Sequence, residues 1–413
     1  MSKANRGFEV IPGGVTAVPG FIAAGVAAGI KKIDSPKKDV AVIFTRYAAK
    51  AAAVFTTNKV KAAPIFVTRE HLAGGIARAV VVNSGNANAC TGEQGMRDAR
   101  RMASLTGELL GIGPREVIVA STGVIGVPLP MDRVEAGILQ AVRDLSETGG
   151  ASAAQAIMTT DTRPKEVAVR LELQGHPVAI GAMAKGSGMI HPNMATMLGF
   201  IATDAAISQP LLQSALRQVV GETFNMLTVD GDTSTNDMVA VMANGAAGNP
   251  EISGPGEDYD LFVQALGYVC AQLARMIARD GEGATKLVTV QVRQAPGVED
   301  ARKAAKAVAN SNLVKTAIFG ADANWGRVLT AVGYSGAEFD PAKVDIFLAG
   351  ERETEQVAGD GAGLRFDEEK ARSILEGDEV TIVIDLHAGG AEATAWTCDL
   401  SYDYVRINAD YRT

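Results

Sequence analysis

Two periods of hydrophobic residues alternate along the chain. From Glu166 to Leu173, apolar residues alternate with polar ones, so four of them share one face, as in a half-buried strand. The segments 287–292 and 379–386 show a similar alternation. Short, continuously apolar runs at 80–82 and 117–119 favour strands covered on both faces. The pattern therefore predicts strands of both kinds.

Longer segments show the spacing of amphipathic helices. Helices are predicted at 96–110, 210–226, 259–278 and 300–309. Strands interleaved with helices indicate a mixed α/β protein, and half-buried strands beside fully covered ones suit stacked sheets sheathed by helices. The glycine- and proline-rich stretch 248–257 is the best loop candidate in the second half. The pattern leaves the strand order open.

Composition narrows the class of protein. A chain of 413 residues exceeds the size at which a single core stops growing, so at least two structural units are expected. A net charge of -8 argues against nucleic-acid binding and favours a small soluble substrate. The apolar stretch 15–30 is interrupted by Pro19 and Gly20 and is too short for a bilayer span. We expect buried structure in a cytoplasmic protein without membrane contact.

The cysteine and histidine residues do not form a recognisable disulfide, metal or catalytic motif. Cys90, Cys270 and Cys398 are too few and too scattered for a disulfide framework or a zinc cluster, and predict buried free thiols in a reducing compartment. The four histidines fall in no Gly-x-Ser-x-Gly or His-Glu-x-x-His motif, so none is expected to be a catalytic base. His191 is the exception, because it lies within the segment discussed next, where its imidazole could tune the chemistry, although a packed or surface histidine is the better interpretation.

Acidic residues in one loop resemble metal ligands at first sight. Asp230, Asp232 and Asp237 nevertheless lack the spacing and the final glutamate of an EF-hand. A polar loop near a site is the more economical interpretation, and no metal is predicted.

The most distinctive segment runs from Lys185 to Gly199 and places a hydroxyl behind turn-forming residues. Glycines and a proline upstream of Thr196 allow a bent, strained backbone. Attack of the Thr196 hydroxyl on the carbonyl of Ala195 would give a new N-terminus, whose amine titrates at roughly 7.7 to 8.0 and can act as base. From spacing alone, a glycine-rich loop before the apolar run 197–201 is the better interpretation.

The segment 185–199 closely resembles the self-cleavage site of the ornithine acetyltransferases, enzymes of arginine biosynthesis. The resemblance extends over nearly the whole chain, and the order of its motifs is very specific. The further matching stretches are 55–58, 62–64, 83–92, 121–126, 158–165, 230–237, 280–286, 320–327 and 402–413.

This resemblance implies a fold and an assembly. The expected fold is a self-cleaving α/β/β/α sandwich of the N-terminal-nucleophile-like aminopeptidase/ornithine acetyltransferase type, followed by a smaller α/β domain. We place the domains at 1–284 and 285–413, with the tail of the second returning to the active site. Cleavage would give fragments 1–195 and 196–413, assembled as a heterotetramer of two copies of each.

The resemblance also assigns roles to residues. Thr196 is the nucleophile, with cleavage after Ala195, and Thr122 with Gly123 forms the oxyanion hole. Taken alone, Thr122 and Gly123 would be a simple strand-to-loop turn, and Lys185, Glu282 and Asn408 would be solvated surface residues. A hydroxyl, a cation and a carboxylate suit substrates that carry both charges. The implied substrate-binding residues are Thr159, Lys185, Thr196, Glu282, Asn408 and Thr413.

The implied reaction moves an acetyl group from N2-acetyl-L-ornithine to L-glutamate through acetyl-Thr196. A second activity, acetylation of glutamate by acetyl-CoA as co-substrate, is also implied, and no metal or bound cofactor. Two alternatives stay open at this point. One is a self-processing N-terminal-nucleophile aminopeptidase or amidohydrolase, and the other is a non-catalytic amino-acid-binding protein.

Overall fold

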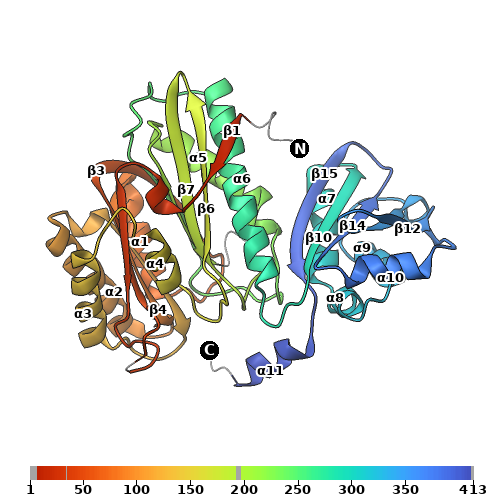
Figure 1. The fold of residues 1–413 in the computed structure, drawn as a ribbon, viewed down its shortest axis with the longest axis horizontal. Helices are drawn as coiled ribbons and strands as arrows, with labels where there is room; N and C mark the ends of the chain where they lie inside the picture. The colour runs from red at the N-terminus through yellow and green to blue at the C-terminus, as the bar shows by residue number, and fades with distance from the viewer. Residues whose placement is uncertain (1–6, 34, 192–196, 411–413) are drawn as a thin grey trace.

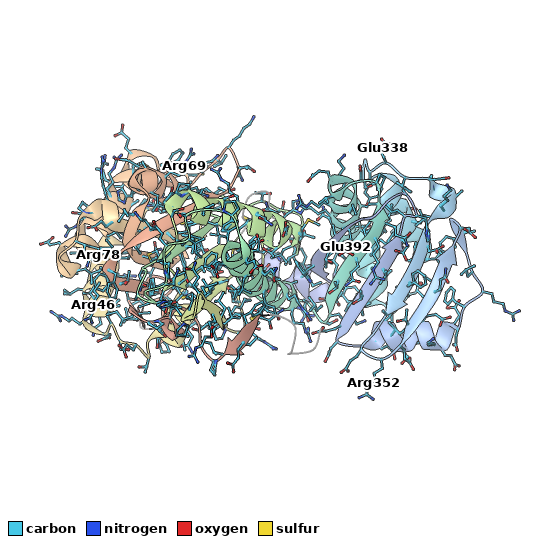
Figure 2. The ribbon with its side chains drawn as sticks, turned by 90° about the horizontal axis from the view of Figure 1, so that it is seen from above. Arg46, Arg69, Arg78, Glu338, Arg352 and Glu392 are labelled. Carbon is cyan, nitrogen blue, oxygen red and sulfur yellow. The ribbon has the colours of Figure 1, made fainter. Side chains whose placement is uncertain are left out.

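A computed structural model describes residues 7–33, 35–191 and 197–410 of the chain. It has two lobes, each built on one sheet (Figures 1 and 2). Figure 2 separates them along the long axis of the molecule, with Arg46 and Arg78 on the first lobe and Arg352 and Glu392 on the second.

The first lobe contains nine described strands and six helices. The strands are β1 (Phe8–Ile11), β2 (Phe21–Val26), β3 (Val40–Phe55), β4 (Ile76–Asn86), β5 (Val117–Val124), β6 (Lys165–Leu173), β7 (His176–Lys185), β8 (Leu198–Thr203) and β9 (Met238–Ala243). The helices are α1 (Ala63–His71), α2 (Gly92–Leu110), α3 (Met131–Arg143), α4 (Gly150–Ala156), α5 (Gln209–Glu222) and α6 (Glu257–Arg279).

The long strand β3 joins the two halves of the first sheet, whose order is β1-β6-β7-β8-β9-β3-β4-β5. Residues 40–45 of β3 pair with β2, and part of this stretch also pairs with β4. Residues 50–55 of the same strand pair with β9. The register with β4 shifts between Phe44 and Ala49, where Tyr47 is exposed. The shift lets one strand pass from one half to the other.

Three cores divide the first lobe into four layers. Between the two sheet halves, Ile43 and Val80 belong to one buried cluster with Phe200 and Met242. Helices α1 and α2 cover the outer face of β4 and β5, and α3 covers β2 and β3 beside them. Helices α5 and α6 cover the outer face of the other half. The α/β/β/α prediction is confirmed, with the correction that both inner layers belong to one hydrogen-bonded sheet.

Helix α6 lies between the lobes (Figure 1). Its buried residues, such as Phe262, Leu266, Val269 and Leu273, recur every three or four positions, which is the spacing of one helix face. By length and composition it could cross a membrane, but 56% of its most apolar window is buried inside the protein. It contacts β6 and β7 on one side and β10 and β15 on the other, so it is a core helix.

The second lobe is a six-stranded sheet with order β13-β12-β11-β14-β10-β15, packed against helices around a separate core. Its tail, α11, lies below the gap between the lobes in Figure 1. The elements are β10 (Leu287–Ala295), α7 (Val298–Asn310), α8 (Asn312–Phe319), α9 (Trp325–Gly333), β11 (Asp345–Ala349), β12 (Thr354–Gly359), β13 (Ala362–Gly363), α10 (Glu368–Glu376), β14 (Glu379–Asp385), β15 (Ala391–Cys398) and α11 (Tyr402–Asp410). The boundary placed at residue 284 stays a prediction.

Most predicted elements are present, but one predicted helix and the predicted burial of one cysteine need correction. The helix predicted at 210–226 is interrupted, because Thr223 leaves helical geometry with φ of -123° and ψ of -84° and a 3-10 turn follows. Cys90 is exposed, since it lies in the turn before α2 with φ of 58°, whereas Cys270 and Cys398 are buried. All three cysteines are free thiols, as predicted.

Candidate functional site

A cavity of about 230 Å³ lies at the end of the first lobe where β5 and β7 finish and β8 and β9 begin. Residues from the second half of the chain close it on the side of α11. Met197 lines it, whereas Ala195, Thr196 and Thr413 lie outside the described residues. The predicted site residues that line this cavity are Thr122, Gly123, Thr159, Lys185, Glu282 and Asn408.

Thr122 and Gly123 lie near the C-terminal end of the strand β5, which runs on to Val124 instead of ending before them. Gly123 has φ of 130°, and a Cβ there would lie 2.4 Å from the backbone carbon of Gly85 on β4. Only glycine fits this combination of positive φ and close backbone approach. The packing of β5 on β4 therefore fixes the backbone that presents Thr122 to the cavity.

The ammonium of Lys185, at the end of β7, is almost fully buried. Its Nζ donates to the Oγ1 of Thr159 at 2.7 Å and to the Oγ1 of Thr122 at 3.3 Å. A threonine hydroxyl that accepts from a lysine keeps its own proton for another acceptor. Burial lowers the pKa of Lys185, and the nearby carboxylate of Asp161 opposes that shift. The Lys185 ammonium and the two threonine hydroxyls can therefore all donate hydrogen bonds to an anion in the cavity.

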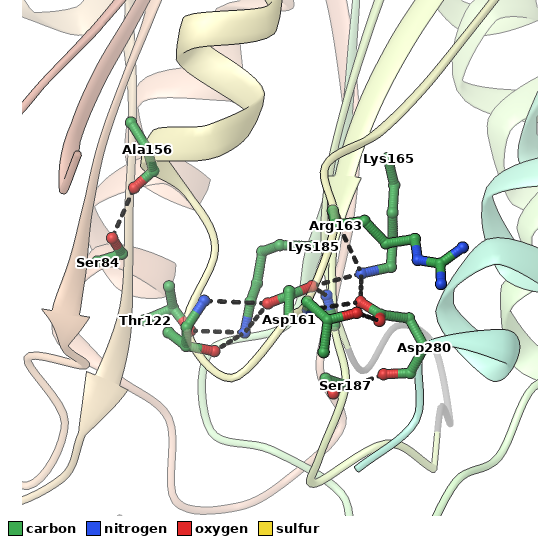
Figure 3. Close-up of polar contacts among 12 residues, drawn as sticks. Ser84, Thr122, Ala156, Asp161, Arg163, Lys165, Lys185, Ser187 and Asp280 are labelled. Carbon is green, nitrogen blue, oxygen red and sulfur yellow. Dashed lines mark hydrogen bonds and ion pairs between the residues drawn. The ribbon is translucent and has the colours of Figure 1, made fainter. Parts of the chain in front are cut away.

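Behind Lys185 lies a fully buried ion-pair network (Figure 3). The Nζ of Lys165 lies 2.7 Å from Oδ1 of Asp161 and 2.6 Å from Oδ2 of Asp280. Burial by itself would raise the pKa of Asp161, but Lys185 and Lys165 together hold that pKa below its usual range. The carboxylate therefore stays charged, and the network links the end of β7 to the loop after α6.

Glu282 also lines the cavity. Its backbone N–H donates to the carbonyl of Ser187 at 3.0 Å, and its carboxylate packs so closely on Gly188 that a Cβ there would lie 2.3 Å from it. The side-chain amide of Asn408, on α11, donates to Oε2 of Glu282 at 2.8 Å. Lys185 and Glu282 are buried and not solvated, whereas Asn408 remains exposed.

The loop predicted to be polar supplies an acidic wall, since Asp230, Asp232 and Asp237 all line the cavity. The carboxylate of Asp230 accepts from the backbone N–H groups of Met189 and Ile190 at 2.6 and 2.9 Å. Asp237 is almost fully buried, its Oδ2 has no hydrogen-bond partner in the described structure, and burial raises its pKa well above the ordinary value. Within the described ranges, no group of three or more His, Cys, Asp or Glu residues could hold a metal ion.

His191 lies at the edge of this loop, with Nδ1 3.1 Å from the Oγ1 of Thr228. Burial, with a smaller contribution from the positive charge of Lys306, lowers its pKa from 6.5 to about 4. Between these values the unfolded chain binds a proton that the folded chain does not. The stabilisation from neutral His191 is therefore complete above pH 6.5 and is lost progressively as the pH falls toward 4.

We expect the melting temperature of the wild type to fall more steeply than that of His191→Gln between pH 6.5 and 4.5. Glutamine can hydrogen-bond Thr228 but does not titrate, so carboxylate effects common to both proteins cancel in the comparison. The measurement is thermal unfolding of both proteins at half-unit pH steps. Parallel curves would show that His191 has the same proton affinity in the folded and unfolded chains.

The sequence did not predict the buried ion-pair network of Lys165, Asp161 and Asp280. Two of these residues belong to the matched stretch 158–165 and the third opens 280–286, but neither stretch carries a local signal of an ion pair. A lysine at the start of an apolar strand is the only available hint. Lysine is almost never fully buried without a partner, so that position calls for acidic residues elsewhere in the chain.

The cavity thus presents three kinds of group around one small volume. Its lining combines threonine hydroxyls, the lysine ammonium and several carboxylates, and the strand β8 begins beside Met197 at its wall. Such a lining can hold a small molecule that carries both a carboxylate and an ammonium group. The donors at the end of β5 can stabilise negative charge on a carbonyl oxygen that is under attack.

Comparison with known proteins yields consistent matches. The model of the ArgJ family matches residues 22–413. The chain is 60% identical to the arginine biosynthesis bifunctional protein ArgJ of Symbiobacterium thermophilum, over 98% of this chain and all of that one. It is 54% identical to the protein of the same name from Caldanaerobacter subterraneus, again over 98% of this chain and all of the other.

Two solved structures are also similar. The arginine biosynthesis bifunctional protein ArgJ of Bacillus halodurans has 48% identity and a TM-score of 0.48, covering 50% of this chain and 96% of that chain. The ornithine acetyltransferase of Mycobacterium tuberculosis, solved in complex with ornithine, has 45% identity and a TM-score of 0.42. That match covers 46% of this chain and all of the other.

Proposed function

Because the chain belongs to the ArgJ family, we propose that it is the acetyltransferase of arginine biosynthesis that moves an acetyl group from N2-acetyl-L-ornithine to L-glutamate. The observation that carries this proposal is the single cavity lined by Thr122, Gly123, Lys185, Glu282 and Asn408. These residues come from four distant parts of the sequence, and the cavity holds cationic and anionic groups at once. N-acetylornithine and glutamate both carry a carboxylate, and ornithine adds a side-chain ammonium.

The proposed mechanism is a double displacement with Thr196 as nucleophile. Thr196 becomes an N-terminal residue when the bond after Ala195 is cut, and its amine takes the proton of its hydroxyl. The oxygen then forms a bond to the acetyl carbon of N-acetylornithine, the C–N bond breaks, and the proton leaves on the ornithine amine. The amine of glutamate then bonds to the acetyl carbon of the ester, the C–O bond to Thr196 breaks, and the proton lost by that amine passes to the Thr196 oxygen.

The described residues take complementary parts in this proposal. Thr122 and Gly123 stabilise the oxyanion in both steps, because both pass through a tetrahedral intermediate. Lys185, with the hydroxyl of Thr159, holds the carboxylate that the two substrates share, and Glu282 with Asn408 holds the side-chain ammonium of ornithine. Thr413 completes the pocket.

Other parts of the proposal concern the whole molecule. Acetyl-CoA is the co-substrate of a second activity, direct acetylation of glutamate, and no metal or bound cofactor takes part. Fragments 1–195 and 196–413 remain together, and two copies of each form a heterotetramer in the cytoplasm. Free thiols in the described structure agree with that reducing compartment.

The test is an assay in which the purified protein receives N-acetylornithine and glutamate, and ornithine and N-acetylglutamate are quantified. Equimolar formation of both products supports the proposal. Release of acetate without N-acetylglutamate would instead support the hydrolase alternative. Tight binding of an amino acid without any product would support the binding-protein alternative.

In the same assay, Glu282→Gln should raise KM for N-acetylornithine by about 10- to 100-fold, because a neutral amide loses a charge-assisted hydrogen bond to the substrate ammonium. KM for glutamate, which lacks that ammonium, should change much less. The change keeps the shape of the side chain and leaves self-cleavage intact. Equal changes in both KM values would return Glu282 to a purely structural role.

A further inference from the structure

Lys165 is a charged residue that the proposed mechanism does not use. Its side chain, at the start of β6, is 1% exposed and does not line the cavity. Its ammonium contacts the carboxylates of Asp161 and Asp280 at hydrogen-bond distance. A buried cation costs free energy unless carboxylates compensate it, so its retention beside the cavity calls for a reason.

Asp161 is shared between two cations. Its Oδ1 accepts from Lys165 and from the backbone N–H of Gly186, both at 2.7 Å, and its Oδ2 accepts from the backbone N–H of Thr159 at 3.0 Å. Lys185 approaches the same Oδ2 only to 4.0 Å, which is beyond a hydrogen bond. Figure 3 shows Asp161 between the two ammonium groups. Lys165 therefore holds the shorter of the two contacts.

Because Lys185 makes no hydrogen bond to Asp161, its ammonium is directed toward the cavity wall. Its ammonium has three donors, and two of them go to the hydroxyls of Thr159 and Thr122 at the cavity wall. No described hydrogen bond takes the third. If Asp161 had no other cation, a buried carboxylate with Lys185 only 4.0 Å away would draw that ammonium into direct contact.

We propose that Lys165 is a positioning residue that satisfies Asp161 and so keeps the Lys185 ammonium turned into the cavity, available to the carboxylate of a substrate. This inference rests on the proposed function in one respect, namely that Lys185 binds the carboxylate shared by N-acetylornithine and glutamate. It adds that the affinity of this binding group is set by a residue outside the cavity. Lys165 acts through Asp161 and does not touch the substrate.

The test is Lys165→Met, which keeps the length and the apolar stem of the side chain and removes its charge. Lys185 should then close on Asp161, and KM should rise by about 10- to 100-fold for both substrates in parallel, because both present a carboxylate. The fall in kcat should be much smaller, since the nucleophile and the oxyanion donors are unchanged. Lys165→Gln, also uncharged but able to hydrogen-bond one carboxylate, should show the same pattern.

Asp280→Asn is the matched control. It removes the charge of the second carboxylate that contacts Lys165. The amide oxygen of the asparagine can still accept from the backbone N–H of Thr162 and from Lys165. Lys165 then has Asp161 as its one charged partner, so Lys185 stays in the cavity and KM should stay close to that of the wild type. If loss of stability were the cause, Asp280→Asn and Lys165→Met would shift KM alike.

A crystal structure of Lys165→Met supplies a second readout that does not depend on activity. The distance from Nζ of Lys185 to Oδ2 of Asp161 should shorten from 4.0 Å to about 2.8 Å. An unchanged distance, or a KM unchanged in both Lys165 variants, would overturn the inference. A wild-type protein that transfers no acetyl group would instead defeat the proposed function, and the crystallographic distance would still test the role of Lys165.

Discussion

Replacement of Thr196 by alanine should leave a single uncut chain of 413 residues and lower acetyl transfer by about 10⁴-fold or more. Alanine has no hydroxyl to attack the carbonyl of Ala195, so no fragments 1–195 and 196–413 can form. It also has no oxygen to carry the acetyl group. Denaturing mass spectrometry of wild type and variant measures the first effect, and the product assay measures the second.

Thr196→Ser is the control for this experiment. Serine keeps the hydroxyl, so some cleavage and some transfer should persist, whereas both vanish in the alanine variant. An alanine variant that turned over normally would end the assignment of Thr196 as nucleophile. A wild-type chain that stayed uncut would point to the binding-protein alternative.

Gly123→Ala should lower kcat/KM by about 10²-fold or more and destabilise the protein by about 2–5 kcal/mol. An alanine Cβ would lie within 2.4–2.7 Å of the backbone of Gly85 and Asn86, and φ of 130° is strained for any L side chain. The end of β5 must therefore move away from β4, and the donors aimed at the oxyanion move with it. Steady-state kinetics and urea unfolding measure the two effects.

Gly126→Ala is the control that separates the effect of backbone strain from the effect of moving the end of β5 away from β4. Gly126 also has positive φ, at 80°, but a Cβ there would meet no atom within 4 Å. The variant should lose about 1 kcal/mol of stability from backbone strain and keep nearly full activity. Equal loss of activity in both variants would show that the loop after β5 responds to strain alone and that close packing of Gly123 on β4 is not required.

The sequence predicted the elements where the pattern is local. Val80 and Val82 face the inner core and Val81 the outer one, so the continuous apolar run at 80–82 correctly predicted a strand covered on both faces. In β6, the alternation beginning at Glu166 matches a strand with Arg170 exposed. Such features depend only on the period of side chains along one strand.

Features that depend on long-range pairing could not be predicted from the pattern. The passage of β3 between the two sheet halves requires partners almost 200 residues apart, since Ala51 pairs with Met242. The same holds for Lys165 and Asp280, 115 residues apart. The gathering of Lys185 and Glu282 around one cavity was expected only from the family resemblance, because charged residues on unrelated segments are usually solvated.

The strand order gives the proposed cut an unusual topology. Strands β8 and β9 of fragment 196–413 lie between β7 and β3 of fragment 1–195, with six paired positions along each of the two boundaries. Cutting the bond after Ala195 therefore separates the chain covalently while leaving its fragments interleaved within one sheet. Separation would require both boundaries to open and the two cores that both fragments share to be exposed, so the two fragments should exchange with other copies no faster than the whole lobe unfolds.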